Sequence, residues 1–181
     1  MIGLTLAALM LTHTEPDVRV CVDWGNASAA VYQPARVFTG AIIGRAGVTI
    51  QWKDRRFCRT SPGDAVMIQF VEGPRNRMPG ALACAMPYEG VHIQVFYDRI
   101  QGLVGPSLLP QLLAHVLAHE IGHMLQGLNR HSASGIMKAR WTGNDYHEMA
   151  RQYFSFTQED IELIHVGMRV RAARTNRAAA R

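Results

Sequence analysis

The sequence predicts an α/β (α+β) fold with a mixed twisted sheet, a long helix, a loop and a C-terminal helix. The N-terminal half contains several short segments that either alternate apolar and polar residues or are uniformly apolar, as strands do. One stretch with apolar residues at helical spacing lies among them. The C-terminal half has two more helical patterns, separated by a polar stretch. This order of elements is typical of an α/β sandwich.

The N-terminal half supplies the predicted sheet. Residues 18–24 (V-R-V-C-V-D-W) alternate in polarity, and residues 27–46 carry the helical pattern, which Gly47 is placed to end. Further strands are expected at residues 48–52, 65–71 and 91–97, with a weaker one at 81–86. The connections between them are polar or rich in glycine and proline.

The C-terminal half begins with a predicted helix over residues 108–126. Ser107 is expected to cap its N-terminus, and Gly127 is placed to end it in a left-handed conformation. Residues 128–153 are polar and are predicted to form a loop. The last helix begins near Thr157, whose hydroxyl can cap it, and acidic residues follow in its first turn.

The composition indicates a single folded domain, which we place at residues 15–168. The chain has 181 residues, 48% hydrophobic and 18% charged, so it is not of the disordered polar class. The formal charge of +5 is concentrated in residues 169–181, which hold five arginines and no acid. We expect this tail to be a solvated helix end that frays. It has no aromatic residues to stack on bases, so nucleic acid is not an expected partner; a binding module that works through the tail is the alternative.

The first residues, M-I-G-L-T-L-A-A-L-M-L, form an apolar run about as long as the hydrophobic region of a signal peptide. The run is too short to span a bilayer as a helix, and no other segment approaches that length. It lacks a basic flank and a clear cleavage site, so a buried first element is the alternative. We favour a signal segment over residues 1–14, which predicts a secreted or cell-envelope protein.

Three cysteines, Cys21, Cys58 and Cys84, lack the C-x-x-C spacing of a structural zinc site. In an exported chain Cys58 and Cys84 could form a disulfide, which leaves Cys21 as a buried thiol in its strand. The sequence alone does not fix the pairing.

The chemistry is concentrated in H-E-I-G-H, which spans His119 to His123 inside the strongly apolar helix. Residues four apart lie on one face of a helix, so both imidazoles can bind a single ion such as zinc. Glu120 is rotated by roughly 100° from His119 and therefore sits beside the metal. There it can take a proton from water and pass it to a leaving amine. Polar groups in so apolar a helix would be costly without a partner, which favours a metal site.

A catalytic zinc site needs a third protein ligand. His131 is the best candidate, because it follows soon after the turn expected at Gly127. His147 or Glu148, in D-Y-H-E-M, is the alternative. His115 shares the helix face of His119 but lies a further turn away, so we interpret it as a supporting or structural residue.

The stretch H-E-I-G-H-M-L-Q-G-L-N-R-H-S-A-S-G-I-M resembles the signature of the metzincin metallopeptidases, especially the matrixin-like ones. Their pattern is H-E-x-x-H-x-x-G-x-x-H followed by a methionine-containing turn. The resemblance implies a metzincin-like fold, zinc bound by His119, His123 and His131, Glu120 as general base, and Met137 beneath the metal. The turning glycine comes one residue later than in the pattern, and His131 two residues later, so the loop is longer here.

The sequence therefore predicts a zinc metalloendopeptidase whose partner is a peptide or protein substrate. The resemblance implies that an extended substrate pairs with an edge strand of the sheet, for which residues 81–86 are the candidate. The alternative is a non-catalytic, zinc-stabilised binding protein of the same fold, which a fourth protein ligand would support. The sequence carries no signal for an oligomeric state.

Overall fold

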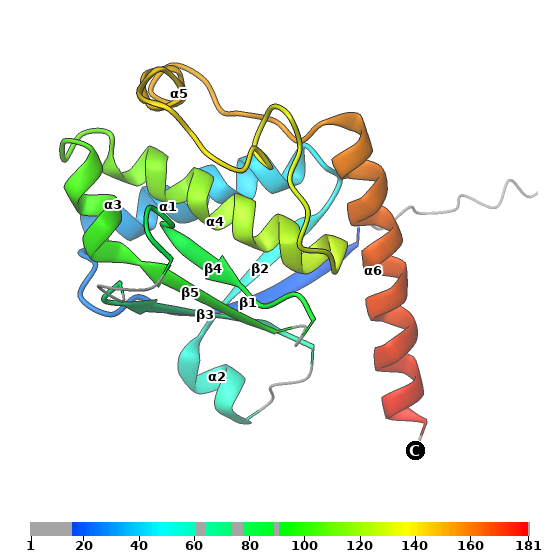
Figure 1. Cartoon of the computed structure of the whole chain (residues 1–181). Coiled ribbons are helices and arrows are strands. Elements are labelled where there is room, and N and C mark those ends of the chain that lie inside the picture. Colours follow the sequence, from blue (N-terminus) through cyan, green and yellow to red (C-terminus); the bar gives the residue numbers. More distant parts are fainter. Residues whose placement is uncertain (1–15, 61–63, 74–77, 89–90, 181) are drawn as a thin grey trace, which may run out of the picture.

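The computed structural model describes residues 16–60, 64–73, 78–88 and 91–180 (Figure 1). The predicted signal segment at residues 1–14 lies outside this part of the chain. None of the described helices is both long enough and apolar enough to cross a membrane.

A five-stranded mixed sheet forms the centre of the described fold, as predicted. Its strands are β1 (Asp17–Asp23), β2 (Thr49–Asp54), β3 (Val66–Val71), β4 (Ala83–Ala85) and β5 (His92–Phe96). They lie in the order β2-β1-β3-β5-β4, and all neighbouring pairs are parallel except β4 with β5. The segment expected to be a weak strand thus supplies β4, a short antiparallel strand at one edge of the sheet.

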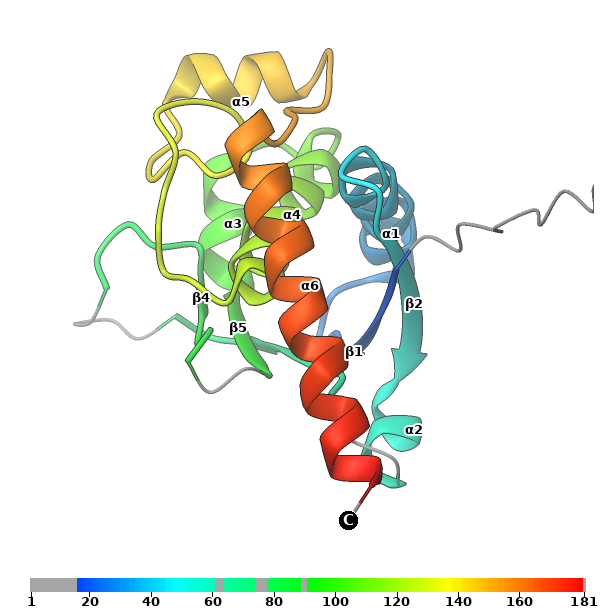
Figure 2. The same ribbon diagram turned by 90° about the vertical axis from the view of Figure 1, so that its right-hand side faces the viewer.

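Six helices accompany the sheet in the described residues: α1 (Ala29–Gly44), α2 (Arg55–Thr60), α3 (Tyr97–Leu103), α4 (Leu109–Gln126), α5 (Gly143–Met149) and α6 (Gln158–Ala179). Helices α1 and α4 lie across one face of the sheet and α2 lies on the opposite side (Figures 1 and 2). The side chains of Val18, Val20 and Val22 alternate toward the covered face and are buried there, as the period of two in a strand requires.

Helix α4 runs through the core, and every residue from Leu112 to Gln126 is buried. An apolar pattern all round a helix is typical of a helix enclosed by protein, and α4 packs against the sheet with α1 beside it and α5 and α6 on its other sides. Gly127 ends it with φ +68°, as predicted. Ser107 does not cap it, because the N-cap position falls on Leu108 and no side chain bonds there.

Helix α6 begins with the capping box predicted at Thr157, in which Thr157 and Asp160 bond each other's backbone N–H groups. It then crosses α4 at Gly167, where a Cβ atom would lie 1.9 Å from the carbonyl oxygen of Leu125. The tail after residue 168 was expected to fray. Instead, the helix continues through this basic segment to Ala179. Arg171 donates a hydrogen bond to the backbone carbonyl of Asp64, which anchors this end.

Three short helices were not predicted, and each lies in a stretch that has the composition of a loop. Helix α2 starts where the Asp54 carboxylate accepts a hydrogen bond from the Phe57 N–H. Helix α3 follows β5 without a connecting turn. Helix α5 lies inside the predicted loop 128–153 and is capped by Thr142 and Asp145. That capping box is the signal in the sequence that the polar composition obscures.

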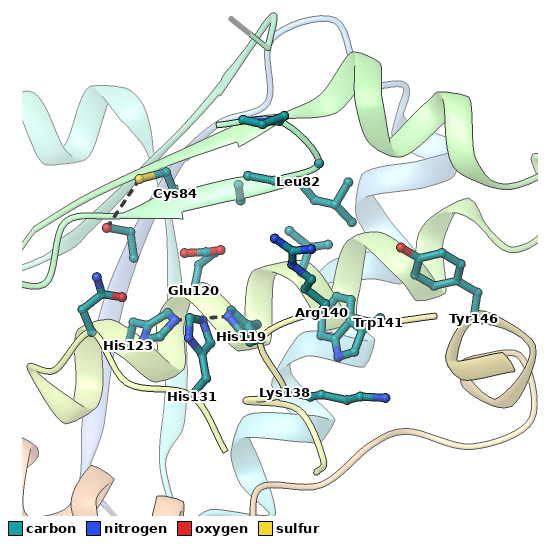
Figure 3. Close-up of a pocket in the computed structure, with 18 residues that line it drawn as sticks. Leu82, Cys84, His119, Glu120, His123, His131, Lys138, Arg140, Trp141 and Tyr146 are labelled. Carbon is teal, nitrogen blue, oxygen red and sulfur yellow. Dashed lines mark hydrogen bonds between the residues drawn. The ribbon is translucent and has the colours of Figure 1, made fainter. Parts of the chain in front are cut away.

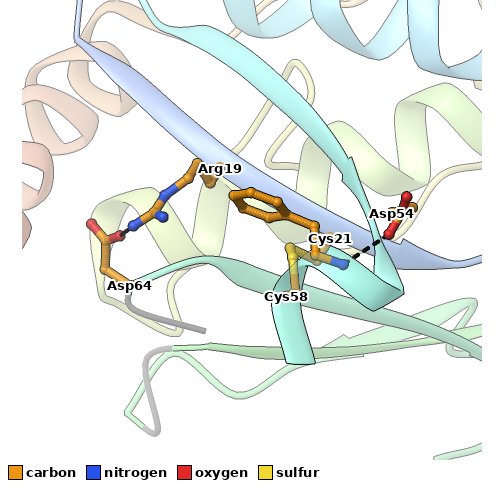
Figure 4. Close-up of a disulfide and its surroundings, with 6 residues drawn as sticks. Arg19, Cys21, Asp54, Cys58 and Asp64 are labelled. Atoms are coloured by element: carbon orange, nitrogen blue, oxygen red, sulfur yellow. Dashed lines mark hydrogen bonds and ion pairs between the residues drawn. A yellow bond between two sulfur atoms is a disulfide. The ribbon is translucent and has the colours of Figure 1, made fainter. Parts of the chain in front are cut away.

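The disulfide joins Cys21 and Cys58, with 6.2 Å between their Cα atoms (Figure 4). The pairing considered from the sequence, Cys58 with Cys84, is wrong. Helix α2 folds Cys58 back over β1, next to β2, whereas Cys84 lies on β4 at the opposite edge of the sheet. Cys84 is therefore a free, half-buried thiol.

Candidate metal centre

Three histidines converge over the C-terminal half of α4 (Figure 3). One ring nitrogen each of His119, His123 and His131 lies within 4.8 Å of the others, and the Nε2 atoms of His119 and His123 are 3.1 Å apart. The structure thus brings together the residues that the sequence predicts. His147 and Glu148, the alternative third ligands, lie on α5 and line a separate surface hollow.

The two helix histidines are held by their outward ring nitrogens. Nδ1 of His119 is 2.7 Å from the carbonyl oxygen of Ile136, and Nδ1 of His123 is 3.0 Å from that of Leu128. A carbonyl only accepts, so Nδ1 must carry the proton, and the lone pair of each Nε2 faces the cluster. Carbonyl partners of this kind orient histidines that bind metals.

The electrostatics of the cluster also suit a cation. Burial, with a contribution from His123, lowers the pKa of His119 to about 3, and burial lowers the pKa of His123 to about 4. Burial also lowers the pKa of the more exposed His131. All three rings are therefore neutral near pH 7, the state in which imidazole binds a metal. The donor set fits zinc, and no fourth His, Cys, Asp or Glu joins the group within the described residues.

His131 is exposed, but the residues on either side of it are fixed. Arg130 Nη1 is 2.9 Å from the Asp160 carboxylate, and Ser132 Oγ donates to the same oxygen at 2.6 Å. The Ser132 N–H also bonds the carbonyl of Met137 at 2.8 Å, which closes the loop. The buried carboxylate of Asp160 thus ties the longer loop to α6 on both sides of the third histidine.

Met137 lies directly against α4. Its side chain is fully buried, and a Cβ atom on Gly122 would come within 2.7 Å of its sulfur. Gly122 lies between the two histidines of the helix, so the methionine packs under them. Only a residue without a side chain leaves room for this contact.

Glu120 faces the cleft between α4 and β4 (Figure 3). Burial raises its pKa to about 8, and a hydrogen bond from the backbone of Ala85 partly offsets that effect. The side chain lies beside the histidines and outside the group of nitrogens that could hold a metal. This is the position expected from its rotation around the helix.

The cleft has a volume of about 460 Å³ and two walls. One wall is β4 with the residues before it, and the other is formed by residues 138–141 together with Tyr146. The sequence did not point to Arg140 in this position. No motif marks it, because its place depends on how the loop after Met137 folds.

His115 is structural. Its Nδ1 lies 2.7 Å from the carbonyl of Gln111, and its Nε2 accepts a hydrogen bond from the backbone N–H of Phe154. Both nitrogens are occupied and the ring is buried, so it supports the chain that follows α5.

No protein-family model and no curated protein sequence matches the chain. Among solved structures, the chain is similar to archaemetzincin from Methanopyrus kandleri, with a TM-score of 0.58 and 15% sequence identity. The match covers 89% of this chain and 99% of that chain. At this level of identity the similarity establishes the fold: the chain has a mixed α/β, metzincin-like architecture.

Proposed function

We propose that this chain is a zinc-dependent metallopeptidase of the metzincin type, in which His119, His123 and His131 hold the ion and Glu120 is the general base. The observation that carries the proposal is the convergence of three neutral imidazoles beside a buried carboxylate in an open cleft. Three histidines without a fourth protein ligand are the set found in catalytic zinc sites. A purely structural zinc protein would have no use for Glu120 in this position.

Zinc held by such a site lowers the pKa of water and polarises a carbonyl as a Lewis acid. The Glu120 carboxylate then accepts a proton from the attacking water and donates it to the amine nitrogen that leaves. The pKa of Glu120 is raised by burial, and a cation within a few ångström lowers it again. A carboxyl group balanced in this way can both accept and return a proton near neutral pH.

Strand β4 provides the binding edge. The carbonyl of Leu82 accepts from Phe96 and the N–H of Met86 donates to His92, so this register of β4 faces β5. The alternate residues, Ala83 and Ala85, direct their backbone groups toward the cleft. An extended peptide can pair with this edge at Ala83 as an added strand, while the backbone of Ala85 bonds Glu120, and the small side chains of both alanines leave the peptide room.

The test is the metal content and peptidase activity of the purified chain. We expect about one zinc per chain in the wild type and in Glu120→Gln, and much less in His131→Ala. His147→Ala is the matched control and should retain zinc. A peptide library should be cut by the wild type and not by Glu120→Gln. Absence of zinc from the wild type would remove the proposal, and zinc retained in His131→Ala would assign the third ligand elsewhere.

A further inference from the structure

Among the described residues that line the cleft, one cation has no partner. Its charged side chains are Glu120, Lys138 and Arg140. Lys138 binds Asp145 at 2.7 Å, and Figure 3 shows its amine pointing away from the cleft. Arg140 is exposed and has no hydrogen-bond or ion-pair partner in the described part of the chain. Its positive charge is therefore free to bind a ligand.

The guanidinium group of Arg140 points into the cleft. Figure 3 shows it reaching toward β4 in the space between Glu120 and Tyr146, below Leu82. Trp141, Tyr146 and Leu82 line the same part of the cleft. These large side chains exclude water once a ligand is bound, and an ionic hydrogen bond is stronger in such surroundings.

The direction of β4 determines which part of a peptide meets Arg140. The chain runs from Leu82, just before β4 and above Arg140, toward Ala85, which bonds Glu120. Antiparallel pairing is the more stable arrangement for an added strand. A peptide paired in this way runs from Ala85 toward Leu82. Its scissile bond would lie beside Glu120, near Ala85, so the residues that follow this bond lie over Arg140.

We propose, on the basis of the peptidase function above, that Arg140 selects substrates with a carboxylate within the two residues that follow the scissile bond. A guanidinium presents paired N–H donors that match a carboxylate in a bidentate arrangement. The carboxylate can belong to an acidic side chain or to the C-terminus of the substrate. No other unpaired charge among the described residues of that end of the cleft competes with it.

The experiment uses peptide pairs that differ only by Glu or Gln at each of two positions on either side of the scissile bond. Each peptide is made with a free and with an amidated C-terminus. For the zinc-loaded wild type, kcat/KM should be about tenfold higher for Glu than for Gln after the bond, with no such ratio before it. The amidated and free-acid series separate an internal acidic side chain from a terminal carboxylate.

A further peptide carries Lys at the same position, and Arg140→Glu should reverse the preference, so that Lys is favoured over Gln there. Arg174→Glu is the matched control: it changes the net charge equally on an exposed part of α6 far from the cleft, and its Glu-to-Gln ratio should equal that of the wild type. Cleavage with equal rates for Glu and Gln would overturn the inference and leave the peptidase proposal intact.

Binding of the same peptides to zinc-loaded Glu120→Gln, measured by fluorescence anisotropy, separates the two proposals further. Suppose that the wild type cuts no peptide, but that Glu peptides bind about tenfold more tightly than Gln peptides and lose this advantage in Arg140→Glu. The proposed role of Arg140 would then be supported and the proposed peptidase activity refuted. Neither cleavage nor charge-dependent binding would overturn both.

Discussion

Replacing Asp160 with alanine is expected to weaken both the fold and the metal site. The carboxylate has no exposed surface and accepts hydrogen bonds from Arg130, Ser132, Gln126 and Thr157. Burial by itself raises the pKa of Asp160, but the bonds from Ser132 and Thr157 and the charge of Arg130 keep that pKa below its usual value. The group is therefore ionised at neutral pH.

The loss of stability follows from these partners. Removing the capping acceptor of α6 costs about 1 kcal/mol. Leaving the donors of Ser132 and Gln126 unpaired adds about 1 kcal/mol or more. Arg130 also loses its buried partner; full burial would make this cost about 3–5 kcal/mol, but the side chain is 28% exposed, so a smaller share applies. We expect a total of about 3 kcal/mol in the free energy of unfolding.

The metal site should weaken as well, because Arg130 and Ser132 flank His131. Without Asp160 the loop is free to move, and zinc affinity should fall by about tenfold, the lower end of the range for residues that support ligands. Urea unfolding of the metal-free protein measures the first effect, and competition with a chelator measures the second.

Asp145→Ala is the matched control. Asp145 completes the capping box of α5 and binds Lys138, but it contacts neither neighbour of His131. It should lose about 1 kcal/mol and keep its zinc affinity. If Asp160→Ala folds and binds zinc as tightly as the wild type, the reasoning that His131 depends on Asp160 is refuted.

Two other predictions concern α4. Gly122→Ala places a Cβ atom 2.7 Å from the sulfur of Met137. The cost of overpacking, about 1–3 kcal/mol, exceeds the gain of about 1 kcal/mol in helix propensity, so the free energy of unfolding in urea should fall. An increase in stability would contradict the contact. For the metal-free protein, the folded pKa values of about 3 for His119 and about 4 for His123 lie below the unfolded value. The unfolded chain therefore binds more protons below about pH 6.5, and the free energy of unfolding should fall by up to about 1.4 kcal/mol per pH unit for each histidine as the pH approaches 4. Unfolding curves from pH 7.5 to 4.5 test this against a His119→Asn/His123→Asn variant, whose profile should be flatter; equal slopes would show that the buried rings do not control acid stability.

The long elements could be predicted because their patterns are dictated by burial. Every side chain of helix α4 from Leu112 to Gln126 is buried, and in strand β3 buried side chains alternate with more exposed ones, so each pattern follows the surroundings of its element. Helix α5 could not be found in this way, since Met149 is its single buried residue and only the capping pair Thr142 and Asp145 marks its start. The disulfide depended on the order of the strands, which no local pattern contains.

The site was predicted unevenly for the same reason. The spacing of His119 and His123 is fixed by helix geometry, so their meeting follows from the sequence. His131 was predicted from its place soon after the turn expected at Gly127, and the resemblance to a family pattern supported it although its spacing differs. What compensates for the two extra residues is the bond network of Asp160, which lies almost thirty positions further along the chain. Long-range hydrogen bonds of this kind leave no periodic trace in a sequence.

The close contact at Gly167 fixes how near α6 lies to α4, and thereby the position of the first turns of α6. Gly167 contacts Leu125, which lies at the end of the helix that carries His123. Two turns earlier in α6 lies Asp160, which holds the loop of His131. A methyl group at position 167 would therefore tilt or lift α6, and the displacement would reach Asp160 as a change in the distance between the two parts of the histidine cluster. Gly167, which lies outside the histidine cluster, thus influences the distance between the helix histidines and His131.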